Sequence, residues 1–145
     1  MTAELVLTAG TAHKDAERLG YDWPIPHIPE AVALVRRRVG SLLKEWDVGA
    51  DSVDEVLLVV SELVTNAVLH ALPPATLTLS CTVSACGRRV RVEVRDHGAA
   101  EVIGEPADDE HGRGCGIVIA LAAACGAYTD ASGCVRWAEL DCPPQ

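Results

Sequence analysis

Residues 58–67, with the sequence LVVSELVTNA, decide the fold that this 145-residue chain is expected to adopt. They form the middle of a helical segment that Asp51 or Ser52 can cap, Ser52 as part of a capping box with Glu55. The segment ends at Ala71, shortly before two prolines. The run Val56–Val60 is apolar on nearly every side, which predicts a helix that is mostly buried. The polar residues of such a helix therefore need an explanation.

Three of these polar residues, Glu62, Asn66 and His70, are spaced four apart and so share one face of the helix. They could be the solvated stripe of an amphipathic helix. Helix propensity, however, gives no reason to place an asparagine in mid-helix. The alternative is the wall of a pocket, in which the amide oxygen of Asn66 ligates Mg²⁺ and Glu62 orients or deprotonates a hydroxyl. A histidine at a helix end, such as His70, is more often structural.

A β-hairpin is expected after this helix, because two runs with β-branched residues, Ala75–Ser84 and Arg88–Arg95, are joined by a turn at residues 85–87. In the second run, valines alternate with charged residues, so one face of the strand should be covered and the other wet. Asp96 and Gly98 follow directly. They could simply form a turn, or the Asp96 carboxylate could accept a hydrogen bond from a ligand donor, such as a purine amine, while Gly98 allows close backbone approach.

Three glycines, Gly112, Gly114 and Gly116, precede an apolar helix that is predicted over Ile117–Cys125. Backbone amides in such a loop, together with the N-terminus of the next helix, commonly bind phosphates. The spacing fits neither GxGxxG nor GxxxxGK[ST], so the Rossmann and Walker classes are excluded. The aperiodic segment between Asp96 and these glycines is expected to form a loop.

Two more features complete the expected fold. A helix over Glu30–Trp46 carries apolar residues at spacings of three and four, and its basic run, residues 36–38, is either a solvated face or a partner-binding surface. Two closing strands are predicted at Tyr128–Ala131 and Val135–Leu140. Helices and hairpins are thus partly segregated, which predicts an α+β two-layer sandwich with helices on one face of a mixed, mainly antiparallel sheet.

The chain length is typical of one domain, which we expect over residues 21–140. Residues 1–20 are expected to be an extension of uncertain order, with a candidate short strand at Glu4–Thr8, and residues 141–145 a tail.

Composition narrows the classes of function. Twelve basic residues against 21 acidic ones give a net charge of -9, which argues against binding to nucleic acid or to a membrane surface. No stretch approaches the roughly 20 apolar residues of a membrane span, and no leader pattern is visible, so a cytoplasmic location is expected. The six cysteines include no CxxC pair and are expected to be free thiols. An anionic ligand would need a local anion-binding feature to bind this acidic chain.

Taken in order, Glu-x3-Asn on a helix, Asp-x-Gly after a strand and a glycine loop before a helix resemble the histidine kinase-like ATPase (Bergerat) fold of histidine kinases, Hsp90 and gyrase. The likeness is greatest to a small branch, the bacterial anti-sigma-factor serine/threonine kinases. Residues 58–67 resemble the N box of that branch, residues 92–98 the first glycine box and residues 112–116 the second. The resemblance extends roughly over Trp23–Leu140.

The resemblance implies ATP and Mg²⁺ as ligands, with Asn66 holding Mg²⁺, Glu62 acting as the general base or positioning the acceptor hydroxyl, and Asp96 reading adenine. The other ATP-binding positions that it implies are Gly98 beneath the base and Gly112, Arg113, Gly114 and Gly116 at the phosphates. It further implies phosphorylation of a serine on an anti-sigma-factor antagonist, coupled to sequestration of a sigma factor in transcription control, and it suggests a homodimer.

Two departures from the family pattern bear on catalysis. Family members often continue the first glycine box as DxGxG, but Ala100 stands at the final position here, and the lid segment, residues 99–111, is short, acidic and without Lys or Arg. A short lid covers phosphates poorly and could slow transfer or leave closure to a partner. The alternative function is therefore a non-catalytic module that holds ATP, or no nucleotide, and sequesters a regulatory partner.

Overall fold

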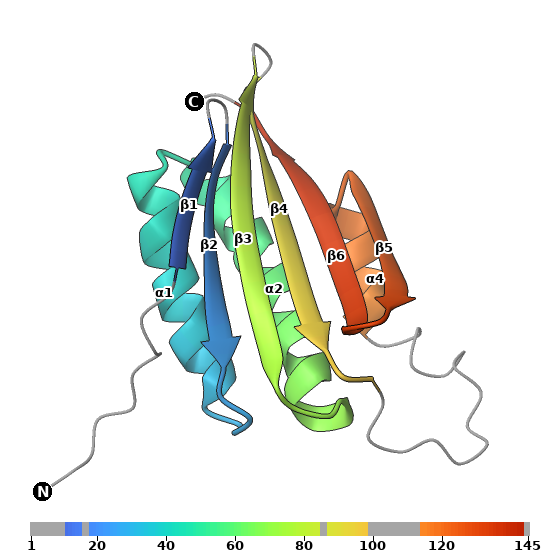
Figure 1. The fold of residues 1–145 in the computed structure, drawn as a ribbon. Coiled ribbons are helices and arrows are strands. Elements are labelled where there is room, and N and C mark those ends of the chain that lie inside the picture. The colour runs from blue at the N-terminus through green and yellow to red at the C-terminus, as the bar shows by residue number, and fades with distance from the viewer. Residues whose placement is uncertain (1–10, 16–17, 85–86, 99–113, 144–145) are drawn as a thin grey trace, which may run out of the picture.

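In a computed structural model of the chain, the structure describes residues 11–15, 18–84, 87–98 and 114–143. The described part is an α+β two-layer sandwich, as the sequence predicts, with helices behind one face of a single sheet (Figure 1). Its elements are β1 (Thr11–Asp15), β2 (Arg18–Ile25), α1 (Ala31–Glu45), α2 (Ala50–His70), β3 (Ala75–Ser84), β4 (Gly87–Asp96), α4 (Gly114–Leu121), β5 (Ala124–Asp130) and β6 (Gly133–Cys142).

The sheet has six strands in the order β1-β2-β3-β4-β6-β5. Each neighbouring pair of these described strands is antiparallel, so the sheet that was expected to be mainly antiparallel contains no parallel pair in this part of the chain. The view in Figure 1 places α1 behind β1 and β2, α2 behind β3 and β4, and α4 behind β5 and β6. Helix α2 packs against both other helices and so forms the centre of the helical layer.

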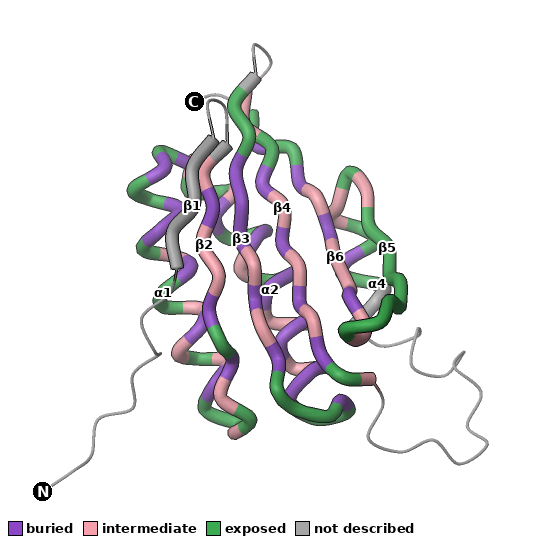
Figure 2. Tube along the Cα trace, viewed as in Figure 1, coloured by how far each residue is buried: buried purple, intermediate pink, exposed green. Residues whose placement is uncertain are grey.

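The hydrophobic core lies between the helices and the inner face of the sheet. Alternation along β4 is as predicted, because Val90, Val92 and Val94 are at most 1% exposed while their charged neighbours face outward. Figure 2 shows this alternation of buried and partly exposed positions along the central strands. Helix α2 is mostly buried, as its apolar middle predicts, with Val56, Val59 and Val60 fully buried.

The two long helices end close to their predicted boundaries, but the capping prediction is wrong. Helix α2 begins at Ala50 with Gly49 as its N-cap and no side-chain cap, so the proposed capping box of Ser52 and Glu55 does not form. Because the helix starts two residues earlier, Ser52 lies inside the first turn, where its side chain hydrogen-bonds to the Cys142 thiol on β6.

The helix predicted over Ile117–Cys125 is too long. Helix α4 ends at Leu121, and β5 already begins at Ala124. Cys125 pairs with Ala138 of β6, so the end of this apolar segment extends the sheet instead of the helix.

One strand, β1, and the first residues of a second, β2, lie within the segment that was expected to be an extension. β1 and the first residues of β2 form a hairpin, and β2 pairs with β3, which fixes Trp23 opposite Leu77 in the core. The candidate strand at Glu4–Thr8, the lid segment, Gly112 and Arg113 all lie outside the described residues.

The basic run on α1 is divided between two roles. Arg36 donates to the Ser61 hydroxyl at 2.5 Å and to the Leu57 carbonyl at 3.1 Å, which joins α1 to α2. Arg37 and Arg38 are exposed, as expected for a solvated face. None of the helices in the described ranges combines the length and the apolar character that crossing a bilayer requires.

Candidate functional site

Two of the three sequence motifs meet at one small pocket, which lies at the end of the sheet where β4 finishes and β6 begins. Its volume is about 50 Å³. The lining residues come from α2, from the end of β4 and from β6, and they are Asn66, His70, Ala71, Asp96, Gly98, Cys134 and Arg136. The structure therefore brings Asn66, Asp96 and Gly98 together, although the two motifs are far apart in sequence.

The end of β4 forms the acidic wall of this pocket. Asp96 is only 6% exposed, and its Oδ1 accepts a hydrogen bond from the Gly98 backbone N–H at 2.8 Å. Gly98 has a φ of 92°, a left-handed conformation that side chains disfavour. The turn after β4 thus holds the carboxylate in place through its own backbone.

A pair of backbone hydrogen bonds ties the end of α2 to the end of β4. The Leu72 N–H donates to the Gly98 carbonyl at 2.8 Å, and the His97 N–H donates to the Leu72 carbonyl at 3.1 Å. This bridge fixes the last turns of α2, which carry Asn66 and His70, across from Asp96. The distance between the two motifs in the pocket is therefore set by backbone contacts.

Close packing of β6 on β4 completes this end of the pocket. Asp96 pairs with Cys134 in the sheet, and the preceding Gly133 has a φ of 136°. A Cβ on Gly133 would lie 2.1 Å from the Asp96 carbonyl oxygen, so only glycine allows this approach.

The face of α2 predicted as polar is only partly directed to the pocket. Asn66 and His70 line it, whereas Glu62, one turn earlier, is partly exposed and is not among the lining residues. Glu62 nevertheless precedes Asn66 by four residues, so it lies on the same face of the helix. The neighbouring Ser61 faces α1, where its hydroxyl donates to the Leu57 carbonyl at 2.8 Å.

The glycine segment opens helix α4 at the same end of the sheet. Because α4 leads through two residues into β5, and β5 runs down to the turn before β6, the N-terminus of α4 lies near the start of β6 (Figure 1). Gly114 is the first residue of the helix, and the exposed Gly116 has nothing within 4 Å of the position of a Cβ. The helix N-terminus therefore lies beside the pocket end of the sheet, as the sequence motif requires.

Two lining residues of β6, Cys134 and Arg136, were not predicted from the sequence. Both lie on the inner face, where they alternate with the outward-facing Val135 and Trp137. A charge such as Arg136 on the apolar side of a strand was a detectable signal, but only the register with β4 places it at the pocket. The Cys134 thiol lies 3.5 Å from the Thr129 hydroxyl.

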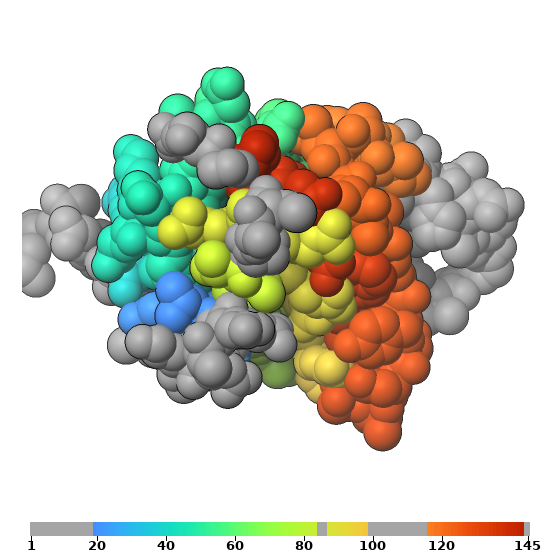
Figure 3. All heavy atoms as spheres, turned by 90° about the horizontal axis from the view of Figure 1, so that it is seen from above, coloured from blue at the N-terminus to red at the C-terminus, as the bar shows by residue number. Residues whose placement is uncertain are grey.

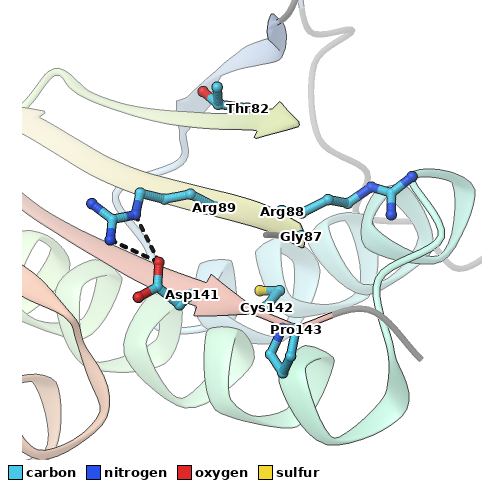
Figure 4. A pocket seen from close by; sticks show the side chains of 7 residues that line it. All are labelled: Thr82, Gly87, Arg88, Arg89, Asp141, Cys142 and Pro143. Carbon is cyan, nitrogen blue, oxygen red and sulfur yellow. Dashed lines mark hydrogen bonds and ion pairs between the residues drawn. The ribbon is translucent and has the colours of Figure 1, made fainter. Parts of the chain in front are cut away.

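A larger hollow of about 570 Å³ lies at the opposite end of the sheet and contains none of the motif residues. Residues Arg88 and Cys142, which line it, pair at the far end of the ladder between β4 and β6 from Asp96 and Cys134. In Figure 4, Asp141 is bound by Arg89, at 2.8 Å, so this charge is already compensated. Seen from above in Figure 3, the C-terminal end of β6 (red) lies at this end of the molecule.

The outer face of the sheet carries most of the described ion pairs. Arg91 binds Glu93 at 2.8 Å and Glu139 at 2.9 Å, and it lies over the ring of Trp137. Arg95 binds Asp130 at 2.8 Å. Hydrogen bonds from Arg95 and from Ser132 hold the pKa of Asp130 well below its usual range.

The fold and this pocket define a known class of domain. Residues 25–138 match the histidine kinase-like ATPase domain, and the chain belongs to that family. Membership in an ATPase family implies ATP as the ligand. Among curated proteins, none has a sequence that matches this chain.

A solved structure with a similar fold contains the RsbU and RsbW domains of Rv1364c from Mycobacterium tuberculosis. The TM-score is 0.63 at 16% sequence identity, over 87% of this chain. The match covers 33% of that longer chain, so this chain spans about a third of its length. The likeness shows a shared fold.

Proposed function

We propose that the protein binds ATP with Mg²⁺ at this pocket and phosphorylates a serine of an anti-sigma-factor antagonist, in a cytoplasmic partner switch that controls transcription. Phosphorylation of the antagonist would be coupled to sequestration of a sigma factor by this protein, which would act as a homodimer. One observation carries the proposal: Asn66 from α2 and Asp96 and Gly98 from β4 line one pocket at the end of the sheet where α4 begins.

The pocket offers the chemistry that a purine base requires. The buried Asp96 carboxylate can accept a hydrogen bond from the adenine amine, and the backbone at Gly98 is accessible beside it. The aromatic residues of the chain lie outside the three motifs, so a carboxylate and exposed backbone are the expected means of base recognition.

The donor set also fits Mg²⁺. This ion commonly takes one or two oxygen ligands from the protein and completes its shell with phosphates and water. Asn66 supplies one such oxygen in the pocket, and within the described residues no cluster of three or more His, Cys, Asp or Glu side chains suggests a metal held by protein alone. When bound, Mg²⁺ neutralises charge on the phosphates.

The phosphates are assigned to the start of α4. A helix N-terminus carries unpaired backbone N–H groups and the positive end of the helix dipole, both of which favour an anion. Gly114 and Gly116 belong to this first turn, and Gly112 and Arg113 precede it in sequence. A local anion-binding feature of this kind lets a chain of net charge -9 bind a polyanion.

Glu62 is assigned a role at the serine hydroxyl that accepts the phosphoryl group. In the transfer, the bond between the γ-phosphorus and the bridging oxygen of ADP breaks, a bond forms to the serine oxygen, and the hydroxyl proton passes to Glu62. Glu62 is partly exposed at the pocket side of α2, where an incoming protein side chain can reach it.

Incubation with labelled ATP and candidate antagonist domains tests the proposal. Label should move to a serine of one antagonist, and Glu62→Ala should abolish transfer while leaving ATP affinity unchanged. Glu55→Gln, an exposed position two turns earlier on the same helix, is the matched control and should transfer normally. Equal transfer by wild type and Glu62→Ala would remove Glu62 from the mechanism.

A second candidate function is a non-catalytic module that sequesters its partner. It is favoured by the position of Glu62 outside the pocket lining and by Ala100 in the first glycine box. Thermal unfolding with and without Mg²⁺ and ATP separates the cases, because nucleotide at 100 times its Kd stabilises the folded state by roughly 2.7 kcal/mol. A nucleotide-dependent rise in Tm without label transfer to any antagonist supports an ATP-binding module, and no rise at millimolar nucleotide supports a nucleotide-free one.

A further inference from the structure

The pocket contains a cation that none of the three motifs includes. Arg136 lies on the inner face of β6, opposite Val94 and two residues beyond Cys134, which itself pairs with Asp96. Arg136 lines the same pocket as Asp96. A guanidinium on the apolar side of a sheet is costly unless its donors find partners.

Arg136 differs from the arginines of the outer face in the partners of its guanidinium. Arg89, Arg91 and Arg95 each bind at least one carboxylate at 2.8 Å. Within the ranges that the structure describes, the side chain of Arg136 makes neither an ion pair nor a hydrogen bond. Its five N–H donors are therefore available to a ligand that enters the pocket.

The position of the pocket indicates which part of a nucleotide Arg136 meets. None of the described residues of α4 is among those that line the pocket, whereas Asp96 and Gly98 are. The pocket is thus the base end of the proposed site, and the phosphate end lies toward the start of α4. A purine edge presents hydrogen-bond acceptors next to donors, and a carboxylate can only accept while a guanidinium can only donate.

We propose that Arg136 is a specificity-determining residue, which donates to an acceptor nitrogen of the purine ring whose amine is bound by Asp96. This inference rests on the proposed nucleotide binding. The pocket, at about 50 Å³, is far smaller than the roughly 300 Å³ at which small-molecule pockets begin, so a base must displace lining side chains. Arg136 is the longest and most flexible of these, and its movement opens the space that its guanidinium then borders.

Calorimetric titration of the full chain with ATP and with adenosine tests this assignment. Because a hydrogen bond to a charged group contributes about 1.5–3 kcal/mol, Arg136→Met should weaken both ligands by the same factor, roughly 10- to 100-fold. Arg136→Lys keeps the charge without the planar fork and should recover part of the affinity. Arg91→Met on the outer face is the matched control and should bind both ligands as wild type does.

Two analogues locate the acceptor. If the guanidinium donates to a ring nitrogen, either 1-deaza-ATP or 7-deaza-ATP should bind wild type more weakly than ATP does, and Arg136→Met should no longer distinguish that analogue from ATP. Thermal unfolding without nucleotide shows whether each variant is folded. If Arg136→Met does not fold, Arg136→Lys takes its place in these comparisons.

Two outcomes would overturn the inference while leaving nucleotide binding intact. One is unchanged affinity in a folded Arg136→Met protein. The other is a loss for ATP but not for adenosine, which would assign the guanidinium to the phosphates. Failure of wild type to bind any nucleotide is a separate result, which would contradict the proposed function itself.

Discussion

The outer face of the sheet and the pocket at its end use the same residue types in opposite ways. On the outer face, arginines and carboxylates bind one another, as in the group formed by Arg91, Glu93 and Glu139. At the pocket, and among the described residues, the buried Asp96 carboxylate accepts only from a backbone N–H, and the side chain of Arg136 forms neither an ion pair nor a hydrogen bond. Compensated charges hold strands together, whereas uncompensated ones in a concave site remain available to a ligand.

The largest expected effect comes from removing the charge of Asp96. Asp96→Asn keeps an oxygen for the Gly98 N–H but loses the charged acceptor, so ATP affinity should fall roughly 10- to 100-fold. Calorimetric titration measures the change. Glu93→Gln, on the same strand but on the outer face, should leave the affinity unchanged, and an equal loss there would mean that the two regions do not differ as described.

The next effect concerns the packing that holds the pocket together. In Gly133→Ala, the new Cβ would meet the Asp96 carbonyl oxygen in a backbone conformation that alanine disfavours. The protein should lose more than about 1 kcal/mol of stability, and its Tm should fall by about 4 °C or more. Gly116→Ala, where a Cβ meets nothing within 4 Å, should not lower the Tm. Equal Tm values for the two variants would contradict the close contact at Gly133.

A smaller effect should appear in cysteine reactivity. Cys134 is half-buried in the pocket, whereas Cys125 is exposed on β5 outside it. At ten times its Kd, nucleotide should slow maleimide labelling of Cys134 by about 10-fold and leave Cys125 unaffected, as measured by mass spectrometry of the labelled peptides. Burial raises the pKa of Cys81 and of Cys142, so these two thiols should react slowly in either case. If nucleotide does not change the labelling rate of Cys134, the ligand binds elsewhere.

The smallest effect is expected on the outer face. The pKa of Asp130 is lowered in the folded protein by hydrogen bonds from Arg95 and Ser132, so the stabilisation is present above the unfolded pKa, about 3.9, and is lost as pH falls through the folded value. Asp130→Asn should lower the Tm at pH 7 by about 2 °C or less, because the pair is exposed and screened. The difference should disappear in strong acid and shrink in high salt. A difference that grows on acidification would contradict the assignment.

The fold could be predicted where the sequence has a clear period. Helix α2 and strands β3 and β4 follow from apolar spacing and from alternating valines. Helix α4 was predicted too long because residues 117–125 are apolar throughout, and only pairing with β6 shows that Cys125 belongs to a strand. The strands β1 and β2 have no comparable pattern and are fixed by their pairing with one another and with β3.

The residues of the site, like the elements of the fold, include some that the sequence predicts and some that only the sheet pairing reveals. Asn66, Asp96 and Gly98 were found because each belongs to a local motif, and the structure brings them to one pocket. Cys134 and Arg136 were missed because neither belongs to a local motif. The charge of Arg136 on the apolar side of a strand was a signal, but the sheet register alone sets both residues beside Asp96. The lid and the first glycine-loop residues lie outside the described residues, so their assigned roles stay predictions.

The central claim is that ATP binds at the end of the sheet where α2, β4 and β6 meet. Hydrogen–deuterium exchange of the full chain with and without Mg²⁺ and ATP tests it most directly. The account predicts slower exchange in residues 66–72, 96–98 and 133–136, with no change along the outer-face ion pairs near Arg89 and Asp141. Unchanged exchange in those three segments under saturating nucleotide, or protection confined to the opposite end near Arg88 and Cys142, would contradict it.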